Sequence, residues 1–420
     1  MADTAHKTEE EIREFHDPPE VFAAKIDQLA DMIVKSKHMV TWTGAGVSTS
    51  TGIPDYRGPN GKWTLAAQKK KRDPSIKVVN SLNASPSPTH MAIVALLRAG
   101  MLKKVISTNT DGLHRRSGVQ PQEIAELHGN TNKVRCNKCG KFALADQRVR
   151  NAAKVHDHKT GQKCPYGCLG EMEDTIINFG EYLLTEVQED ANANGRKADL
   201  LLGLGSSFRV ITCDALEDIQ TNGGSLVIVN LQMTPYDDYC KLRIFATCDE
   251  VMTALMAKLK IPIPDWTLHR YVAFRTPAAG ATTPPTSAAV RVQGIDETGS
   301  AYAWIKSAEL VSLPDGVTDV AKATKVGGGV PSSHCVFQPI VCEAKVKAVP
   351  ATHILLCPMG HRGEPDVLVP LPKAPVADGT SFHLALDMKT NTWKISSIGV
   401  VAMPSAKSAA PKKRSPSKTR

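Results

Sequence analysis

Apolar residues follow a helical pattern near the start of the chain and then form short continuous runs. A helix is predicted over residues 20–35, because apolar side chains there recur at spacings of three and four. These side chains are Phe22, Ile26, Leu29 and Ile33. The runs that follow are residues 38–43, 104–107, 199–204 and 225–229, with helical patterns between them at 90–102 and 250–259. Buried runs that alternate with helices predict a parallel sheet of the α/β class.

Small or polar residues follow each of the four predicted strands. In α/β sheets, ligands bind beyond the carboxyl ends of the strands. We therefore expect the segments after the strands to meet at one cleft. The segments are Gly44-Ala45-Gly46, Thr108–Asp111, Gly205-Ser206-Ser207 and Asn230-Leu231-Gln232.

A polar, glycine-spaced segment at 133–178 interrupts this pattern and predicts a small inserted zinc module. It holds two close cysteine pairs, and four thiolates in two pairs suit a tetrahedral structural Zn²⁺ site. Buried free thiols are the alternative. The pairs are Cys136 with Cys139 and Cys164 with Cys168. His156 and His158 are expected to be exposed loop residues.

The composition changes after Pro264, and we divide the chain on that basis. Alternating apolar stretches and turn signals predict a β-rich extension at 289–403, with a mostly disordered tail as the alternative. The predicted parts are an N-terminal arm (1–19), a sheet domain (20–132 and 179–265), the zinc module, a linker (266–288), the extension and a basic tail (404–420).

The net charge of +9 lies mostly in the tail, which carries six cationic side chains and no acid. Residues 411–416 predict a nuclear localisation signal or a contact with the backbone of DNA. A solvated tail without a role is the alternative. A second basic cluster at 69–72 either meets phosphates or is a solvated loop.

No apolar run is long enough to cross a membrane, and the acidic N-terminus lacks the apolar region of a secretory signal. We therefore expect an intracellular protein without a membrane partner. In that setting the ten cysteines are thiols or metal ligands and not disulfides.

The glycines after the first predicted strand suit a phosphate-binding loop. Glycine lets backbone N–H groups approach a pyrophosphate, and the N-terminus of a following helix adds positive potential. Thr49 stands at the third glycine position of the usual motif, so a tight strand-to-helix turn is the alternative. In the next loop, Arg57 can bind phosphate while Tyr56 or Trp63 covers a ring. An ordered surface loop is the alternative there.

Several motifs occur in the order found in sirtuins, which are NAD-dependent protein-lysine deacylases, and the chain resembles this family over about residues 10–265. The shared motifs are Gly44–Ser48, Gly52–Pro59, Asn109–His114, Leu127–Asn130 and the paired cysteines. Residues 59–64, 174–176, 229–232 and 248–252 are most similar to the nuclear, chromatin-associated class IV branch.

The resemblance implies a Rossmann-type domain with NAD bound between it and the zinc module. The cofactor-binding residues that it implies are Gly44, Ala45, Gly46, Thr49, Asp55, Tyr56, Arg57, Trp63, Thr108, Asn109, His128, Gly205, Ser206, Ser207, Asn230, Gln232 and Cys248. It also implies that a strand with Phe179, Gly180 and Glu181 pairs with the substrate peptide. An ordinary strand-to-turn transition is the alternative for these three residues.

By the same resemblance, His128 is the catalytic base, and a histidine suits proton transfer from a ribose hydroxyl near neutral pH. Asn109 and Asp111 shape the nicotinamide pocket and position water. His90 and His114 are given structural roles. Thr108 departs from the family, which has glutamine there, and a polar contact toward the cofactor ribose is expected to be lost.

The function implied is that of an NAD-dependent protein-lysine deacylase in the nucleus, with histones as the substrate class. Such a transferase moves the acyl group to ADP-ribose and releases nicotinamide. Two alternatives stay open because of Thr108: mono-ADP-ribosylation of protein targets, and a weakly catalytic NAD-binding chromatin scaffold. The basic tail adds an expected contact with nucleosomes or DNA.

Overall fold

The structure is a computed structural model that describes residues 5–6, 8–150, 154–210, 212–275, 289–314, 316–317, 319–344, 351–372 and 378–402. The described residues form two compact units. Of the described residues, the first unit contains those up to Asn130 and Ile176–Trp266, and the second contains Thr131–Thr175 and those from Thr267 to Ala402. Within the described residues, no helix has the length and apolar character that a membrane crossing requires. The basic tail and most of the expected linker lie outside the described residues.

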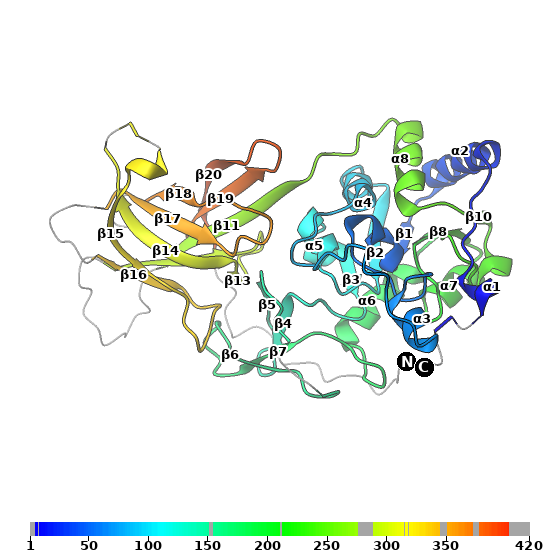
Figure 1. Ribbon diagram of the computed structural model, residues 1–420, viewed down its shortest axis with the longest axis horizontal. Coiled ribbons are helices and arrows are strands. Elements are labelled where there is room, and N and C mark those ends of the chain that lie inside the picture. The colour runs from blue at the N-terminus through cyan, green and yellow to red at the C-terminus, as the bar shows by residue number, and fades with distance from the viewer. Residues whose placement is uncertain are drawn as a thin grey trace. The chain divides into compact units, whose positions relative to one another are not determined.

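A six-stranded parallel sheet forms the centre of the first unit (Figure 1). The strand order is β10-β9-β8-β1-β2-β3, which is the doubly wound order of Rossmann-type domains. The predicted Rossmann-type sheet is therefore confirmed. Its strands are β1 (Met39–Thr43), β2 (Leu102–Ser107), β3 (Ile124–Glu126), β8 (Leu200–Leu204), β9 (Ser225–Val229) and β10 (Leu242–Ile244).

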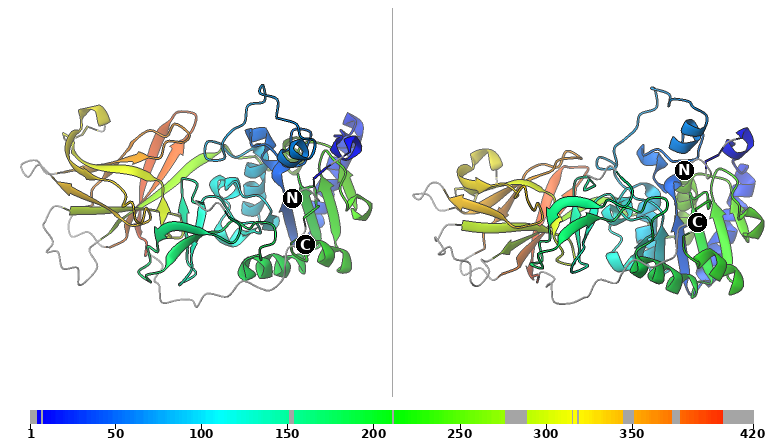
Figure 2. Two further views of the ribbon diagram at one scale, coloured as in Figure 1. Left: turned by 60° about the horizontal axis from the view of Figure 1, so that its bottom comes forward. Right: turned by 90° about the horizontal axis from the view of Figure 1, so that it is seen from below.

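Helices cover both faces of this sheet, and Figure 2 gives two further views of them. Residues of α2, α4 and α8 form one hydrophobic core with one face, and residues of α6 and α7 form another with the opposite face. In β8, Leu200 and Leu202 join the first core while Leu201 joins the second, so the strand is apolar throughout. The helices are α1 (Glu9–Ile12), α2 (Pro19–Lys35), α3 (Lys62–Ala67), α4 (Pro88–Arg98), α5 (Leu113–Ser117), α6 (Thr185–Gly195), α7 (Ala215–Thr221) and α8 (Cys248–Leu259).

The second unit contains two sheets. The smaller has the order β13-β5-β4-β7-β6. Its strands are β4 (Lys133–Cys136), β5 (Phe142–Ala145), β6 (Lys159–Lys163), β7 (Glu171–Asp174) and β13 (Tyr302–Ala303). The larger is antiparallel, with the order β18-β17-β14-β15-β16-β12-β11-β19-β20. Its strands are β11 (Thr267–Arg275), β12 (Ala289–Ile295), β14 (Ile305–Ser312), β15 (Thr324–Gly329), β16 (Ile340–Ala344), β17 (His353–Pro358), β18 (Val367–Pro370), β19 (Thr380–Asp387) and β20 (Thr392–Val400).

The larger sheet confirms that the C-terminal extension is rich in β-strands. The structure differs from the expected linker in its first part, because residues 267–275 form β11. Alternate side chains of that strand, including Leu268, Arg270 and Val272, are buried. Strand β11 lies between β12 and β19, so one face of it is buried although the composition of this stretch resembles that of a linker.

The extension and the zinc module share one hydrophobic core within the second unit. Strand β13 of the extension pairs in parallel with β5 of the module, and Asp146 donates its backbone N–H to Ala303 O at 2.8 Å. The shared core contains Val134, Ala143 and Ala145 from the module and Ala301, Ala303, Cys335 and Phe337 from the extension. These contacts join segments that the sequence pattern treats as separate.

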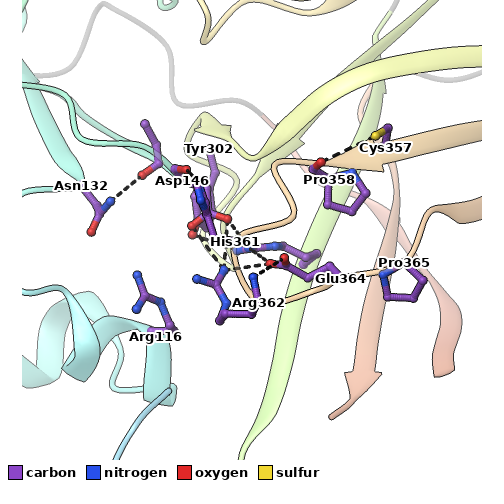
Figure 3. Close-up of polar contacts among 12 residues, drawn as sticks. Arg116, Asn132, Asp146, Tyr302, Cys357, Pro358, His361, Arg362, Glu364 and Pro365 are labelled. Carbon is purple, nitrogen blue, oxygen red and sulfur yellow. Dashed lines mark hydrogen bonds and ion pairs between the residues drawn. The ribbon is translucent and has the colours of Figure 1, made fainter. Parts of the chain in front are cut away.

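A buried cluster of charged side chains also connects the zinc module with the extension (Figure 3). Arg270 Nη2 lies 2.6 Å from Asp146 Oδ2 and 3.2 Å from Glu364 Oε1. Arg362 Nη2 contacts the same two carboxylates at 3.1 and 2.9 Å. Tyr302 accepts a hydrogen bond from Arg270 at 2.9 Å. Two cations and two anions balance, which is what a buried cluster of charges requires.

Candidate active site

A cavity lies at the carboxyl ends of the parallel strands in the first unit, where the predicted segments meet. Most of the cofactor-binding positions proposed from the sequence line it. They are Gly44, Ala45, Gly46, Asp55, Tyr56, Arg57, Trp63, Thr108, Asn109, His128, Gly205, Ser206, Ser207, Asn230 and Gln232. Phe179, from the proposed substrate segment, lines the same cavity. The structure adds residues that were not proposed to bind the cofactor, namely Thr110, Ile176, Ile177, Asn178, Phe208, Arg209 and Val210.

The glycines after β1 and β8 allow the two backbones to touch at the point where the strand order reverses. Gly46 donates its N–H to Gly205 O at 2.9 Å, and a Cβ on Gly46 would lie 2.6 Å from Gly205 Cα. Gly205 has a φ of +60°, which glycine adopts without strain. Glycine is therefore required at both positions for the two backbones to pack against each other.

The segment after this loop differs from the expected helix. Two short 3₁₀ turns, Ala45–Val47 and Thr49–Thr51, follow β1 in place of an α-helix. Thr49 is exposed, lies outside the cavity lining and donates its hydroxyl to Gly46 O at 3.1 Å. The backbone N–H groups of Gly46, Val47 and Ser48 already donate to carbonyls of the protein, so cationic side chains are the donors to consider for a phosphate here.

The loop at 52–63 brings charged and aromatic side chains to the cavity. Asp55 Oδ2 accepts the Gly58 N–H at 2.6 Å, and burial raises the pKa of this carboxyl. The guanidinium of Arg57 lies 4.5 Å from the ring centre of Trp63, and Tyr56 packs on the same ring at 4.7 Å. The side chains of Arg57 and Trp63 are thus held in place beside the phosphate-binding loop.

A second arginine, which sequence reasoning missed, lines the cavity after β8. Arg209 Nη2 lies 3.0 Å from Glu11 Oε1. Burial, and then repulsion from Arg209, lower the pKa of Arg57 to about 10. Phe208 has a φ of +49° and is buried against Trp42, which fixes the chain next to Arg209. Two guanidiniums suit the two charges of a pyrophosphate.

His128 lies at the cavity wall with a defined ring orientation. Its Nδ1 is 3.2 Å from Thr108 O. A carbonyl accepts only, so Nδ1 carries the proton and Nε2 is left as a proton acceptor. Burial lowers the pKa of His128 to about 4, with a further lowering by Arg57 and an opposing effect of the Thr108 carbonyl. The imidazole is neutral at pH 7.

Asn109 and Asp111, both expected to shape the nicotinamide pocket and position water, occupy different positions. Asn109 lines the cavity and donates from Nδ2 to Gly44 O at 2.9 Å. Asp111 lies outside the lining, where Ser48 Oγ donates to its Oδ2 at 2.7 Å and Leu113 N donates to its Oδ1 at 2.9 Å. Asp111 therefore ties the glycine loop to the start of α5, which makes it a positioning residue in this structure.

Thr108 directs its hydroxyl to the sheet. Its Oγ1 donates to Thr43 O at 3.1 Å. Thr43 Oγ1 lies 2.9 Å from His114 Nε2, and His90 Nδ1 lies 2.8 Å from Ser87 Oγ. Both histidines are buried and bonded to hydroxyl groups, and burial lowers the pKa of each.

The remaining predicted positions divide between the cavity and its surroundings. Gln232 lines the cavity and donates from Nε2 to Ile12 O at 2.9 Å. Cys248 does not line the cavity, because it begins α8 and its thiol packs in the hydrophobic core. A short apolar side chain at a helix start is drawn into that core.

The proposed substrate segment forms a turn in place of a strand. Glu181 donates its N–H to Asn178 O at 3.0 Å, and its buried carboxylate accepts the Asn178 N–H at 2.6 Å. Gly180 has a φ of +85°, and neither Gly180 nor Glu181 lines the cavity. Phe179 is 42% exposed and lies 5.5 Å from the Trp63 ring.

The four predicted cysteine ligands meet in the second unit. Their sulfur atoms all lie within 4.8 Å of one another, with 3.3 Å between Cys136 and Cys168 and 3.8 Å between Cys139 and Cys164. Sulfurs at about 2.3 Å from a tetrahedral Zn²⁺ stand about 3.8 Å apart, so the cluster fits one structural zinc ion. Gly170 is required beside it, since a Cβ there would lie 2.6 Å from Cys136 Sγ.

The two nearby histidines do not join this cluster. His156 is exposed, as expected, but the expectation for His158 was wrong. His158 is buried, and its Nδ1 lies 3.3 Å from Asp174 Oδ1. The pairing with a buried carboxylate explains why a histidine in a polar segment faces inward.

The fold and the site together define a Rossmann-type dinucleotide-binding protein with a four-cysteine zinc module. Comparison with known sequences identifies the family, because the sequence pattern of the Sir2 family matches residues 70–212. A relative named NAD-dependent protein deacetylase Sirt6, from Drosophila melanogaster, is 35% identical over 60% of this chain and 81% of its own length. The chain belongs to the Sir2 family, the sirtuins.

Two other relatives match the same part of the chain. NAD-dependent protein deacetylase SRT1 of Arabidopsis thaliana is 40% identical over 61% of this chain and 53% of its own length. NAD-dependent protein deacetylase sirtuin-7 of Bos taurus is 36% identical over 64% of this chain and 67% of its own length. The chain thus spans about half the length of the first of these curated relatives.

Proposed function

We propose that the protein is an NAD-dependent protein-lysine deacylase that transfers the acyl group to ADP-ribose and releases nicotinamide. One observation carries this proposal. His128 presents an unprotonated Nε2, fixed by the Nδ1 contact with Thr108 O, in a cavity that two guanidiniums also line. The names of the relatives, which are NAD-dependent protein deacetylases, support the same reaction.

Each group in the cavity has a part in this proposal. NAD supplies a ribose carbon from which nicotinamide can leave, and the acyl-lysine oxygen is the nucleophile. The guanidiniums of Arg57 and Arg209, which line the cavity together with Gly46 and Gly205, would hold the pyrophosphate. Asn109 is fixed by its bond to Gly44 O and shapes the nicotinamide end. His128 accepts a proton from a ribose hydroxyl.

The low pKa of His128 fits this role once an anion is bound. Arg57 contributes to the lowering, and a pyrophosphate beside Arg57 offsets that positive charge. Anion binding therefore moves the pKa of His128 upward, toward the value at which a general base works best at neutral pH. The same ligand that brings the ribose hydroxyl strengthens the base that deprotonates it.

The proposed substrate is an acyl-lysine protein, with histones as the class and the nucleus as the compartment. Phe179 is half exposed at the cavity and packs near Trp63, so it can line the passage of an acylated side chain. The nuclear proposal rests on the basic cluster at 411–416 and on its expected contact with nucleosomal DNA. Deletion of 404–420 should weaken nucleosome binding and make the remainder less sensitive to salt.

The test is nicotinamide release by the zinc-loaded chain with and without an acetylated histone peptide, with products followed by mass. We expect peptide-dependent release and O-acetyl-ADP-ribose. Substitution His128→Ala should reduce both by at least 10²-fold, in line with the loss of a general base. His156→Ala, an exposed histidine, serves as the matched control. Unchanged release in His128→Ala would overturn the proposal.

A second candidate, mono-ADP-ribosylation, is favoured by one observation at Thr108. Its hydroxyl donates to Thr43 O, so its proton is not available to a ligand. Without a hydrogen bond from Thr108, the cofactor ribose would be held less firmly, and a nucleophilic side chain of a target protein could then attack it in place of the acyl-lysine oxygen. Label from the adenine of NAD that stays covalently on a protein, and that falls in Thr108→Gln, would support this activity. Label found only in the soluble product would rule it out.

A further inference from the structure

Two histidines stand ring to ring on neighbouring strands of the second unit, far in sequence from the cysteine cluster. His269 lies in β11 and His383 in β19. Nδ1 of His269 is 2.9 Å from Nε2 of His383, and the ring centres are 5.0 Å apart. A short contact between two imidazole nitrogens is the arrangement that a shared proton or a metal ion produces.

The register of the sheet places these rings on one face. Tyr271 pairs with His383 and His269 pairs with Ala385, so all four side chains project to the same side. Tyr271 stacks on the His383 ring with 4.7 Å between centres and an interplanar angle of 19°. His269 is exposed and His383 is half-buried, so the pair is fixed by packing and is also open to solvent.

A carboxylate lies beyond the other edge of β11. Strand β12 pairs with β11 at Tyr271 and Ile295, and Glu297 follows two residues later in the turn after β12, where its charge acts on His269. The charge of Glu297 raises the pKa of His269, whereas burial and the charge of His383 lower it more strongly. Burial also lowers the pKa of His383.

We propose that His269 and His383 form a second metal site, which takes a divalent first-row cation with a preference for imidazole nitrogen, Zn²⁺ foremost. Two nitrogens at about 2.0–2.1 Å from a tetrahedral Zn²⁺ stand about 3.3 Å apart, close to the spacing that the pair has now. The hydrogen shared between the rings moves to the outer nitrogen of its own ring when the cation binds. Glu297, whose charge acts on His269, is the carboxylate that we propose as a third ligand, with water in the remaining position.

This site differs in chemistry from the four-cysteine cluster. Thiolates select Zn²⁺ strongly and close the coordination sphere, whereas two imidazoles leave positions open and bind more weakly. The second site is therefore expected to fill only after the cysteines are saturated. Its occupancy would crosslink β11 to β19.

The test is a titration of the full-length, zinc-loaded protein with ZnCl₂, followed by calorimetry. We expect one further equivalent to bind. That equivalent should be lost in His269→Ala and in His383→Ala, and weakened several-fold in Glu297→Gln. His334→Ala, an exposed histidine of the same unit, is the matched control and should bind as the parent does. No further equivalent, or one that all variants retain, would overturn the proposal.

A second measurement uses the unsubstituted protein, so that its result does not depend on whether the alanine variants fold. One equivalent of Cu²⁺ added to the zinc-loaded protein should give an electron paramagnetic resonance spectrum with hyperfine coupling to two imidazole nitrogens. A spectrum with oxygen ligands alone would contradict the site, even if the alanine variants failed to fold.

Discussion

Asp146 and Arg270 form a buried ion pair at 2.6 Å although 124 residues separate them in the sequence. Asp146 directly follows β5, the strand of the zinc module that pairs with β13, and Arg270 lies in β11. Both side chains are almost fully buried, at 1% and 2% exposure. The pair therefore connects two stretches of chain that composition alone would assign to different domains.

Loss of the negative charge at this pair should be costly. In Asp146→Asn, Arg270 and Arg362 lose one of the two carboxylates that they share in a buried site and keep Glu364. Breaking a buried pair in this way typically costs about 3–5 kcal/mol. We expect a marked fall in the melting temperature of the second unit. The control is Glu171→Gln, which removes an exposed pair with Lys163 and should leave the melting temperature within error.

Zinc removal should loosen the extension as well as the module. The cysteines share their core with Ala301, Ala303 and Phe337, so metal loss withdraws support from strands far along the chain. Hydrogen exchange measured after chelation should show faster exchange in β12, β13 and β14 together with β4–β7. Faster exchange confined to the module would mean that the two parts are energetically independent.

The titration of His128 should fall near pH 4 in the ligand-free protein. The unfolded chain binds this proton first, near pH 6.5, so the contribution of His128 to stability is full above that pH. It declines as the pH falls toward 4. Histidine-selective NMR reads the folded value directly. Arg57→Gln removes a charge that lowers the pKa and should move the midpoint to higher pH. A midpoint that stays near 6.5 in the parent would show that the imidazole is hydrated.

A side chain at Gly46 should disrupt the dinucleotide cavity. The added Cβ of Gly46→Ala would lie 2.6 Å from Gly205 Cα, and backbone on both sides leaves no flexible group to yield. Overpacking of this kind costs about 1–3 kcal/mol. We expect weaker binding of ADP-ribose by calorimetry and a lower melting temperature. Ser50→Ala, at an exposed position of the same loop, should change neither quantity.

Local patterns predicted the first unit well, because each of its strands and each of its site motifs is a short continuous segment of the chain. Continuous apolar runs identify β1, β2, β8 and β9, whereas β3 and β10, with three residues each, are too short to show a pattern. The glycine loop, Arg57 and His128 stand in compact motifs and do meet at one cavity. Arg209 belongs to no such motif, and its role follows only from the turn at Phe208.

Residues that a motif shares need not share a cavity. Asp111 and Cys248 both lie within recognisable motifs. The side chain of Asp111, however, accepts a hydrogen bond from Ser48 in the glycine loop, and that of Cys248 packs in the hydrophobic core. A motif constrains the backbone that holds a site as well as the groups that face the ligand. The union of the zinc module with the extension could not be predicted at all, because its contacts lie at large sequence separation and involve ordinary alanines.

The second unit is assembled from two stretches of chain with Ile176–Trp266 between them. During synthesis the four cysteines emerge early, but the strand that pairs with β5 and both arginines that bind Asp146 emerge much later. A nascent or truncated chain that ends near Trp266 would thus carry a zinc module that lacks the extension's share of the hydrophobic core and the two arginines that contact Asp146. The boundary of a stable fragment is therefore set by the extension and not by the end of the family resemblance.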